Sequence, residues 1–488
     1  MLIMNFLSVY SVLDWIDSNV VWGIPLLSLI LVVGVVLTFR LKGVQVTQLG
    51  KSLKLMVQND SEGKGKGEVS SFGALCISMA ATLGTGKIVG VALAIAIGGP
   101  GALFWMILAA VFGMATKYAE GFLAIRFRKV EEDGTVIGGP YAYIEYGMGK
   151  KWSWLAKVFA VCGALAGVMG IGTMTQMNSI IDSVNSVFDP NKTNIVNIFG
   201  NSVTICAIIV GVVVTVIAAI AVIGGIKRIE KVSVVLVPIM ALIFFVSCLL
   251  VLLFNIPAIP GAIVDVFKGA FSTKAIGGGT AGIVMMVALR EGISKGVFSN
   301  EAGLGSAPIA LASSETNDPV RQGLVCMSST FIDTMVLCLI IGLGIVVTGT
   351  YKDSEGINIT INSFAEGIGI STNFSAIIVM FCITTFAFTT IIGWNVYGEK
   401  CITYLFKGSK KAVFVYKIVY ILSVAIAPFL TLNIIWKISS IFNGLMALPN
   451  LVGLLALSGL VARETNAYIK KQKEAKKAKK MELVETEK

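Results

Sequence analysis

The sequence contains no histidine at all, and charged residues are scarce in it. The lack of histidine excludes a Ser-His-Asp triad, the common zinc sites and a histidine proton relay. Charged side chains make up 14% and hydrophobic ones 56% of the 488 residues, whereas soluble proteins are roughly half apolar and a quarter charged. We therefore predict a membrane protein. With no catalytic constellation among its few embedded carboxylates, we also predict that it is not an enzyme.

The sequence also lacks CxxC pairs and the features of a cleaved signal peptide. None of the eight cysteines forms a CxxC pair and most lie in apolar segments, so we expect buried hydrophobic side chains and no bound cofactor. The first basic residue is Arg40, and the apolar run at 20–39 is long enough to cross a membrane. A cleaved signal peptide is therefore not expected.

Long apolar runs dominate the rest of the sequence. A transmembrane helix needs about 20 consecutive apolar residues, and about eleven stretches approach that length. They lie at 20–39, 72–98, 101–125, 154–178, 202–223, 232–254, 276–299, 322–348, 374–392, 412–431 and 436–460. The predicted fold class is therefore an all-α membrane protein with about eleven transmembrane helices.

The net charge is +11, and the basic residues are dispersed between the apolar runs. We interpret them as signals of membrane topology and expect no nucleic-acid partner. If the segment 40–71 is cytoplasmic, most of the Lys and Arg residues lie on that side of the membrane. The other side has only Lys192, Lys268, Lys274 and Lys352. This asymmetry predicts a multi-pass protein of the cell membrane with its N-terminus outside and its C-terminus in the cytoplasm. The basic tail, 461–488, either rests on anionic lipid or, as we prefer, is a solvated helix or disordered.

The stretches after the N-terminal helix and loop (1–71) divide into two blocks of five, 72–254 and 276–460. Because five is odd, the blocks run in opposite directions, as in transporters built from an inverted repeat with broken helices at the midplane. The first helix of each block contains a glycine cluster, at Gly84–Gly86 and at Gly277–Gly279. We predict that both helices are broken there, although glycines can also serve close helix packing.

Several motifs resemble those of the alanine or glycine:cation symporter family. They run in family order from about 72 to 460: Gly84-Thr85-Gly86, Gly98-Gly99-Pro100, Lys117-Tyr118-Ala119-Glu120, Gly138-Gly139-Pro140, Gly224-Gly225-Ile226, the run Ser299 to Pro308, Phe331-Ile332-Asp333-Thr334, Gly393-Trp394, Tyr397-Gly398-Glu399 and Leu448-Pro449-Asn450. The resemblance implies sodium-coupled import of a small neutral amino acid, alanine or glycine, with glutamine as an alternative. It also implies the five-plus-five fold shared with neurotransmitter:sodium symporters, with sodium as coupling ion and no obligate protein partner. A channel or a sensor are the other classes left open.

The candidate substrate site consists of the two predicted breaks and one glutamine. Half-helix N-termini favour the carboxylate of a zwitterion and free carbonyls favour its ammonium group. The candidates are Gly84, Thr85, Gly86 and Lys87 in the first block and Gly277, Gly278, Gly279 and Thr280 in the second. Gln176 resembles the family's substrate glutamine, and the alternative is an interhelical hydrogen bond.

Two adjacent threonines, Thr389 and Thr390, offer hydroxyl oxygens of the kind that hard cations prefer. Together with carbonyls at Ala80 and Leu83 they resemble the sodium site of this fold. The alternative is that each hydroxyl bonds to its own helix backbone.

Lys87 departs from the family, which usually has asparagine after the Gly-Thr-Gly turn. A lysine near the midplane costs about 2.5–3.5 kcal/mol on insertion scales. It could pair with the substrate carboxylate, replace a bound cation and so alter the stoichiometry, or carry a coupling proton; snorkelling or a carboxylate partner are the structural alternatives. Asp333 is a candidate for a gate or ion path, whereas Lys117 and Glu120, at i,i+3 spacing, are expected to pair with each other.

Overall fold

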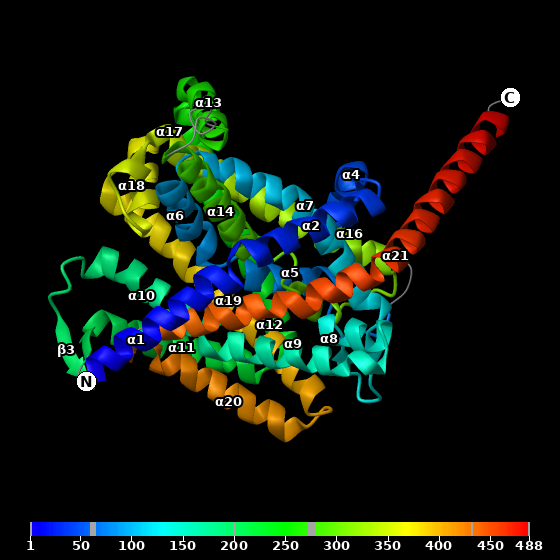
Figure 1. The fold of residues 1–488 in the computed structure, drawn as a ribbon, viewed down its shortest axis with the longest axis horizontal. Coiled ribbons are helices and arrows are strands. Elements are labelled where there is room, and N and C mark those ends of the chain that lie inside the picture. The colour runs from blue at the N-terminus through cyan, green and yellow to red at the C-terminus, as the bar shows by residue number, and fades with distance from the viewer. Residues whose placement is uncertain (1, 59–64, 199–200, 272–279, 431–432, 487–488) are drawn as a thin grey trace.

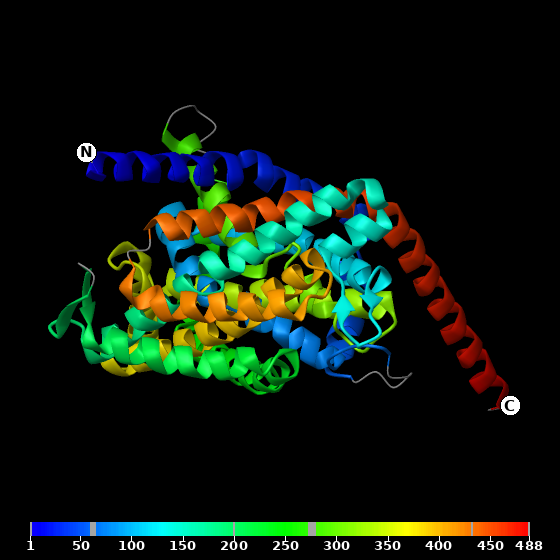
Figure 2. The same ribbon diagram turned by 90° about the horizontal axis from the view of Figure 1, so that it is seen from below.

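The computed structural model describes residues 2–58, 65–198, 201–271, 280–430 and 433–486. These residues form a bundle of helices with two short β-hairpins at its surface (Figure 1). The prediction of an all-α membrane protein is confirmed. The C-terminal helix continues through the basic tail as far as Thr486 and projects away from the bundle (Figure 2).

The chain winds through a long series of helices and two pairs of strands. The α-helices of the first half are α1 Leu2–Trp15, α2 Ile24–Arg40, α3 Val44–Thr47, α4 Leu49–Val57, α5 Ser71–Thr82, α6 Val89–Gly98, α7 Gly101–Arg126, α8 Pro140–Ala142, α9 Ser153–Ala166, α10 Met174–Phe188, α11 Ile205–Ile223, α12 Ile226–Phe254 and α13 Ile259–Ala270. Those of the second half are α14 Thr280–Asn300, α15 Ala307–Leu311, α16 Pro319–Thr330, α17 Leu339–Thr348, α18 Ile357–Ile368, α19 Thr372–Leu405, α20 Lys410–Ile426 and α21 Asn433–Thr486. The strands pair as β1 Lys129–Val130 with β2 Val136–Ile137, and β3 Ile195–Ile198 with β4 Asn201–Thr204.

The membrane-spanning helices match the predicted apolar stretches. In the described part of the chain, nine helices are long and apolar enough to cross a membrane, and the bent pair α5–α6 makes a tenth span. Helix α14 covers the remaining predicted stretch but contains Arg290, Glu291 and Lys295 within its 21 residues. The number of eleven spans therefore stays a prediction.

Lipid-facing positions are easily recognised on the outer helices. Large apolar side chains are exposed along α11 and α12, among them Ile209, Val213, Val235 and Leu242, each at least half exposed. Such surfaces are unfavourable in water and suit the hydrocarbon core of a bilayer. Helices α5 and α7 contribute mostly buried residues, so the polar groups they hold lie inside the protein.

The first helix of the first block is broken where the sequence predicts it. Helix α5 starts at a serine cap, Ser70, whose hydroxyl accepts the Gly73 N–H at 3.0 Å. It ends at Thr82, the backbone of Gly84 is extended, and a short turn at Thr85–Lys87 leads into α6. The two halves are bent by 59°. The prediction of a break at the Gly84–Gly86 cluster is confirmed.

The break predicted in the second block lies outside the described residues, and the structure shows an interruption farther along the chain. Gly277, Gly278 and Gly279 are outside the described residues, and Thr280 is the first residue of an uninterrupted α14. This interruption separates α14 from α15, at 301–306, where Glu301, Gly303 and Gly305 all have positive φ. Two glycines at such positions avoid the strain that a side chain would suffer.

A buried carboxylate from α7 stabilises this second break. Glu120 is fully buried, and its Oε1 accepts the N–H groups of Gly303 at 3.1 Å and Gly305 at 3.2 Å and the amide of Asn450 at 2.7 Å. The carboxylate thus satisfies backbone donors that the unwinding exposes. The predicted pair of Lys117 and Glu120 makes no direct contact among the described residues, because the Glu120 carboxylate is directed at the break and Lys117 Nζ has no hydrogen-bond partner there. The i,i+3 spacing of the two residues permits a contact, but the Glu120 carboxylate binds the backbone N–H groups at the break.

Candidate functional site

Gly84, at the first break, lies at the centre of the candidate site. A Cβ on Gly84 would stand 3.1 Å from the Thr390 hydroxyl and 3.7 Å from both polar atoms of the Gln176 side chain. The structure therefore brings together three sequence-predicted candidates from α5–α6, α10 and α19. The lack of a side chain at Gly84 keeps this meeting point open to a ligand.

Gln176 lies near the start of α10, just after the chain kinks at the end of α9. Its Nε2 donates to the carbonyl of Ile171 at 3.0 Å, and its Oε1 is 3.5 Å from the Thr85 hydroxyl. The hydrogen bond to Ile171 fixes the orientation of the amide within its own segment. The amide oxygen faces the first break, where it can accept a hydrogen bond from a substrate ammonium group.

Thr390 connects α19 to the end of α5. Its hydroxyl donates to the carbonyl of Ala80 at 3.1 Å and to Phe386 in its own helix at 2.9 Å. The Ala80 carbonyl is available because the N–H of Gly84, its partner in an unbroken helix, donates to Thr82 instead. The break therefore leaves this carbonyl without a partner in its own helix and places it beside a hydroxyl oxygen, which is a ligand pair for a hard cation.

Thr389 points in a different direction from its neighbour. Its hydroxyl donates to the Phe386 carbonyl at 3.0 Å and lies 3.6 Å from the Met240 sulfur on α12. Leu83 directly succeeds α5, and its N–H donates to the Met79 carbonyl at 2.6 Å. Of the four residues predicted for sodium, the structure thus joins Ala80 and Thr390 by a hydrogen bond, while the roles of Leu83 and Thr389 stay predictions.

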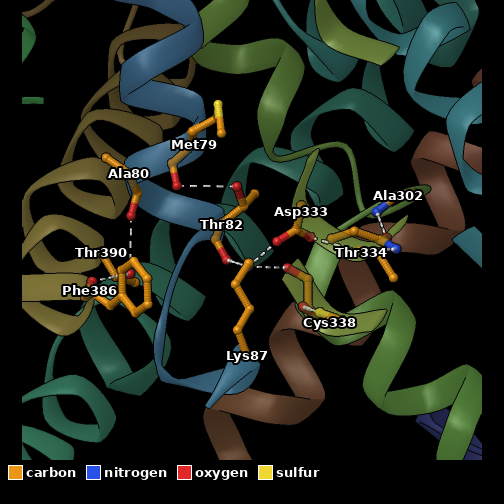
Figure 3. A network of polar contacts seen from close by, with 12 residues as sticks. Met79, Ala80, Thr82, Lys87, Ala302, Asp333, Thr334, Cys338, Phe386 and Thr390 are labelled. Carbon is orange, nitrogen blue, oxygen red and sulfur yellow. Dashed lines mark hydrogen bonds and ion pairs between the residues drawn. The ribbon is translucent and has the colours of Figure 1, made fainter. Parts of the chain in front are cut away.

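Lys87 and Asp333, which the sequence analysis treats separately, form one buried ion pair (Figure 3). The Lys87 Nζ lies 2.7 Å from Asp333 Oδ1, and it also donates to the carbonyls of Thr82 at 2.5 Å and Ser299 at 3.1 Å. The Lys87 side chain is fully buried and Asp333 is 4% exposed. Lysine therefore has a carboxylate partner and does not snorkel to an interface.

The residues just before the second break also contact the Lys87–Asp333 pair and its neighbours. Ser299 and Asn300 end α14, and the Asn300 amide donates to the Thr334 hydroxyl at 3.1 Å while its oxygen accepts the Ala302 N–H at 2.9 Å. Thr334 in turn donates to Asp333 at 3.1 Å. Sequence reasoning missed this contribution, although the closely spaced Gly303, Gly305 and Pro308 are a recognisable sign of an interruption.

Phe298 lies beside the first break and also lines a polar cavity. The Phe298 ring would be 3.7 Å from a Cβ on Gly86. The same ring borders a cavity of about 180 Å³ lined by Asp17, Ser18, Trp22, Arg290, Glu291, Ser294, Lys295, Phe298, Trp436, Lys437 and Ser440. Both acidic and basic groups face it, which suits the approach of a zwitterion.

A second group of polar contacts surrounds Lys400 and Arg128. Lys400, near the end of α19, pairs with Glu68 at 2.5 Å and donates to the Val136 carbonyl at 3.1 Å. Arg128 donates to the carbonyls of Ala312 at 2.7 Å and Thr316 at 2.8 Å. These bonds join the segment before α5, the β1–β2 hairpin and the segment after α15.

Comparisons of the whole chain with known proteins identify its family. A model of one protein family covers residues 6–482, nearly the full length. The chain belongs to the sodium:alanine symporter family. The resemblance stated from the motifs is confirmed, and the chain is a multi-pass membrane transporter.

Individual members of the sodium:alanine symporter family resemble the chain from end to end. The chain is 40% identical to the sodium/alanine symporter AgcS of Methanococcus maripaludis, across 97% of this chain and 100% of that protein. It is 34% identical to the probable sodium/glutamine symporter GlnT of Bacillus subtilis, across 94% of this chain and 91% of that protein. The crystal structure of MhsT in complex with L-phenylalanine shares the fold, with a TM-score of 0.55 at 13% identity, over 83% of this chain and 99% of the other.

Proposed function

We propose that the protein imports a small neutral amino acid, alanine or glycine, together with sodium. The observation that carries the proposal is the Ala80 carbonyl, which has no partner in its own helix, beside the Thr390 hydroxyl and next to Gly84. Membership of the sodium:alanine symporter family and the likeness to AgcS support both the ion and the substrate. The likeness to GlnT keeps glutamine as a second candidate.

The substrate is proposed to bind between the first break and Gln176. The backbone N–H groups at the start of the Thr85–Lys87 turn would hold its carboxylate, and the Gln176 oxygen its ammonium group. Thr390 stands 3.1 Å from a Cβ on Gly84, and Phe298 stands 3.7 Å from one on Gly86. This narrow space favours substrates with the smallest side chains.

Sodium is proposed to bind at Ala80, Leu83, Thr389 and Thr390. Carbonyl and hydroxyl oxygens suit a hard cation, and the ion would hold α5 against α19 as the Thr390 hydrogen bond does now. A single charge that crosses with a 100 mV potential gains about 2.3 kcal/mol, enough for a substrate ratio of roughly fifty-fold. Sodium entry can therefore drive accumulation.

We propose that the two five-helix blocks, 72–254 and 276–460, move against each other around this site. The Phe298 side would face outward, with the N-terminus outside, and the side closed by Glu68 and Lys400 would face the cytoplasm with the basic tail. The excess of Lys and Arg in the segments on the closed side supports this orientation. Transport then requires the Glu68–Lys400 layer to open while Phe298 covers the site.

Uptake of labelled alanine into proteoliposomes tests the proposal, with sodium and proton gradients imposed separately. We expect saturable accumulation above the outside concentration with an inward sodium gradient, and little uptake with the proton gradient alone. Accumulation driven by protons alone would contradict sodium coupling. Conductance without saturable exchange would indicate a channel, and binding without uptake a sensor.

Replacing Gln176 with leucine is expected to raise the KM for alanine about ten-fold or more. The substitution keeps the size of the side chain but removes the oxygen that faces the first break, and losing a hydrogen bond to a charged group costs about 1.5–3 kcal/mol. Initial uptake rates at saturating sodium measure the effect. Asn178→Leu is the matched control, because the Asn178 amide donates at 2.9 Å to Met174 in its own helix. An unchanged KM in Gln176→Leu would contradict the assignment.

A further inference from the structure

We propose that the Lys87 ammonium takes the place of a coupling cation. The protein would then take up one sodium ion fewer per substrate than it would if sodium occupied the position of the ammonium. This inference rests on the proposed sodium coupling and refines its stoichiometry. It is carried by the set of groups around Nζ, which come from both broken helices and from a third element (Figure 3).

The oxygens around the ammonium are those of a cation site. Two are backbone carbonyls, of Thr82 at the end of α5 and of Ser299 near the end of α14, and the third belongs to the Asp333 carboxylate. The ends of interrupted helices present carbonyls that suit cations, and carboxylate and carbonyl oxygens are the preferred ligands of hard cations. The ammonium donates hydrogen bonds to the two carbonyls and forms an ion pair with the carboxylate.

The position of the site ties it to the transport machinery. Thr82 is the last residue before the first break, and Ser299 lies just before the second. A charge held here therefore joins the two moving blocks, as a bound ion between them would. Because Lys87 is covalently attached, this charge is present whether or not sodium is available.

Removing the amine would leave the site with an uncompensated negative charge. Asp333 would remain as a buried carboxylate, 4% exposed, facing two carbonyl oxygens and the space that the amine had filled. An unpaired buried charge is strongly unfavourable, so the site would take a monovalent cation from solution. Sodium, the coupling ion already proposed, is the cation we expect there.

Lys87→Asn tests the inference, because it removes the charge and adds an oxygen ligand. Wild-type uptake is expected to depend on sodium with a Hill coefficient of about 1, and Lys87→Asn with a coefficient that approaches about 2, the number of sites. The matched control is the double variant Lys87→Asn/Asp333→Asn. It lacks the anionic ligand and should return to a coefficient of about 1.

The outcomes separate this inference from the proposed function. Wild-type uptake that does not depend on sodium would defeat the proposed function. Sodium-dependent wild-type uptake with an unchanged Hill coefficient in an active Lys87→Asn variant would overturn only the inference. So would a variant whose uptake becomes dependent on pH with its sodium order unchanged, since Asp333 would then bind a proton. A higher KM for substrate with no change in sodium order would also overturn it, and would assign Lys87 to the substrate carboxylate.

A stability measurement covers variants that fold but do not transport. The thermal unfolding temperature of purified Lys87→Asn should rise more with sodium chloride than with choline chloride, and by more than in the wild type. If Lys87→Asn does not fold, Lys87→Ser leaves room for an ion and a water molecule and takes its place. Failure of both variants to gain stability from sodium would also overturn the inference.

Discussion

Replacing Asp333 with alanine is expected to lower the free energy of unfolding by about 3–5 kcal/mol, the cost of breaking a buried ion pair from one side. The substitution leaves the Lys87 ammonium fully buried with two carbonyls but no counterion. Natural proteins are stable by only about 5–15 kcal/mol, so this loss removes a large fraction of the total stability and should lower both the unfolding temperature and the yield. Thermal unfolding in detergent and the yield of monodisperse protein measure this effect.

Two variants serve as controls for this prediction. The double variant Lys87→Met/Asp333→Leu removes both charges at similar size and should recover most of the lost stability, because a buried pair is often replaceable by apolar residues. Glu474→Ala breaks an exposed pair with Lys470, whose side chains are 66% and 80% exposed, and should change stability by less than about 1 kcal/mol. An Asp333→Ala protein as stable as the wild type would show that the ion pair does not contribute to the stability of the fold.

Replacing Gly393 with valine is expected to reduce uptake about 100-fold, the effect that a displacement of roughly 1 Å has on a reactive geometry. A Cβ on Gly393 would stand 2.7 Å from the backbone nitrogen of Ala81, so α19 and α5 are in backbone contact here. A valine would force the helices apart and separate the Thr390 hydroxyl from the Ala80 carbonyl, now 3.1 Å away. Initial rates of alanine uptake, with protein yield measured in parallel, test the prediction.

Gly261→Val adds the same atoms elsewhere and is the matched control for Gly393→Val. A Cβ on Gly261, in the peripheral helix α13, would meet no atom within 4 Å among the described residues. Its uptake rate should stay within about a factor of two of the wild type, since surface substitutions usually change little. If Gly393→Val transports as well as Gly261→Val, the close contact between α5 and α19 is not required for coupling.

The fold class and the first broken helix could be predicted from the sequence, because both depend on local patterns. Apolar length identifies spans, and the Gly84–Gly86 cluster permits unwinding where it occurs. The interruption at 301–306 could not be placed in this way. A glycine cluster shows where unwinding is tolerated, but Gly303 and Gly305 unwind where Glu120 can bond their N–H groups, and this partner is far away in the sequence.

The candidate site shows the same division between local and distant information. Lys87 and Asp333 stand out separately as charges in apolar stretches, but only the packing of the helices makes them a pair. Thr389 and Thr390 look equivalent in sequence, yet neighbours on a helix point about 100° apart. As a result only Thr390 bonds to Ala80, while Thr389 faces Met240.

The central claim is that sodium and substrate bind next to each other at the first break. Equilibrium binding of labelled alanine to the purified protein, measured as the sodium concentration varies, tests this claim most directly. We predict that alanine binds tightly in sodium and weakly in choline. Thr390→Val should need about ten times more sodium for half-maximal binding, the effect of losing one hydrogen-bonding ligand group. Equal alanine binding in choline and in sodium, or an unchanged sodium requirement in Thr390→Val, would contradict the account.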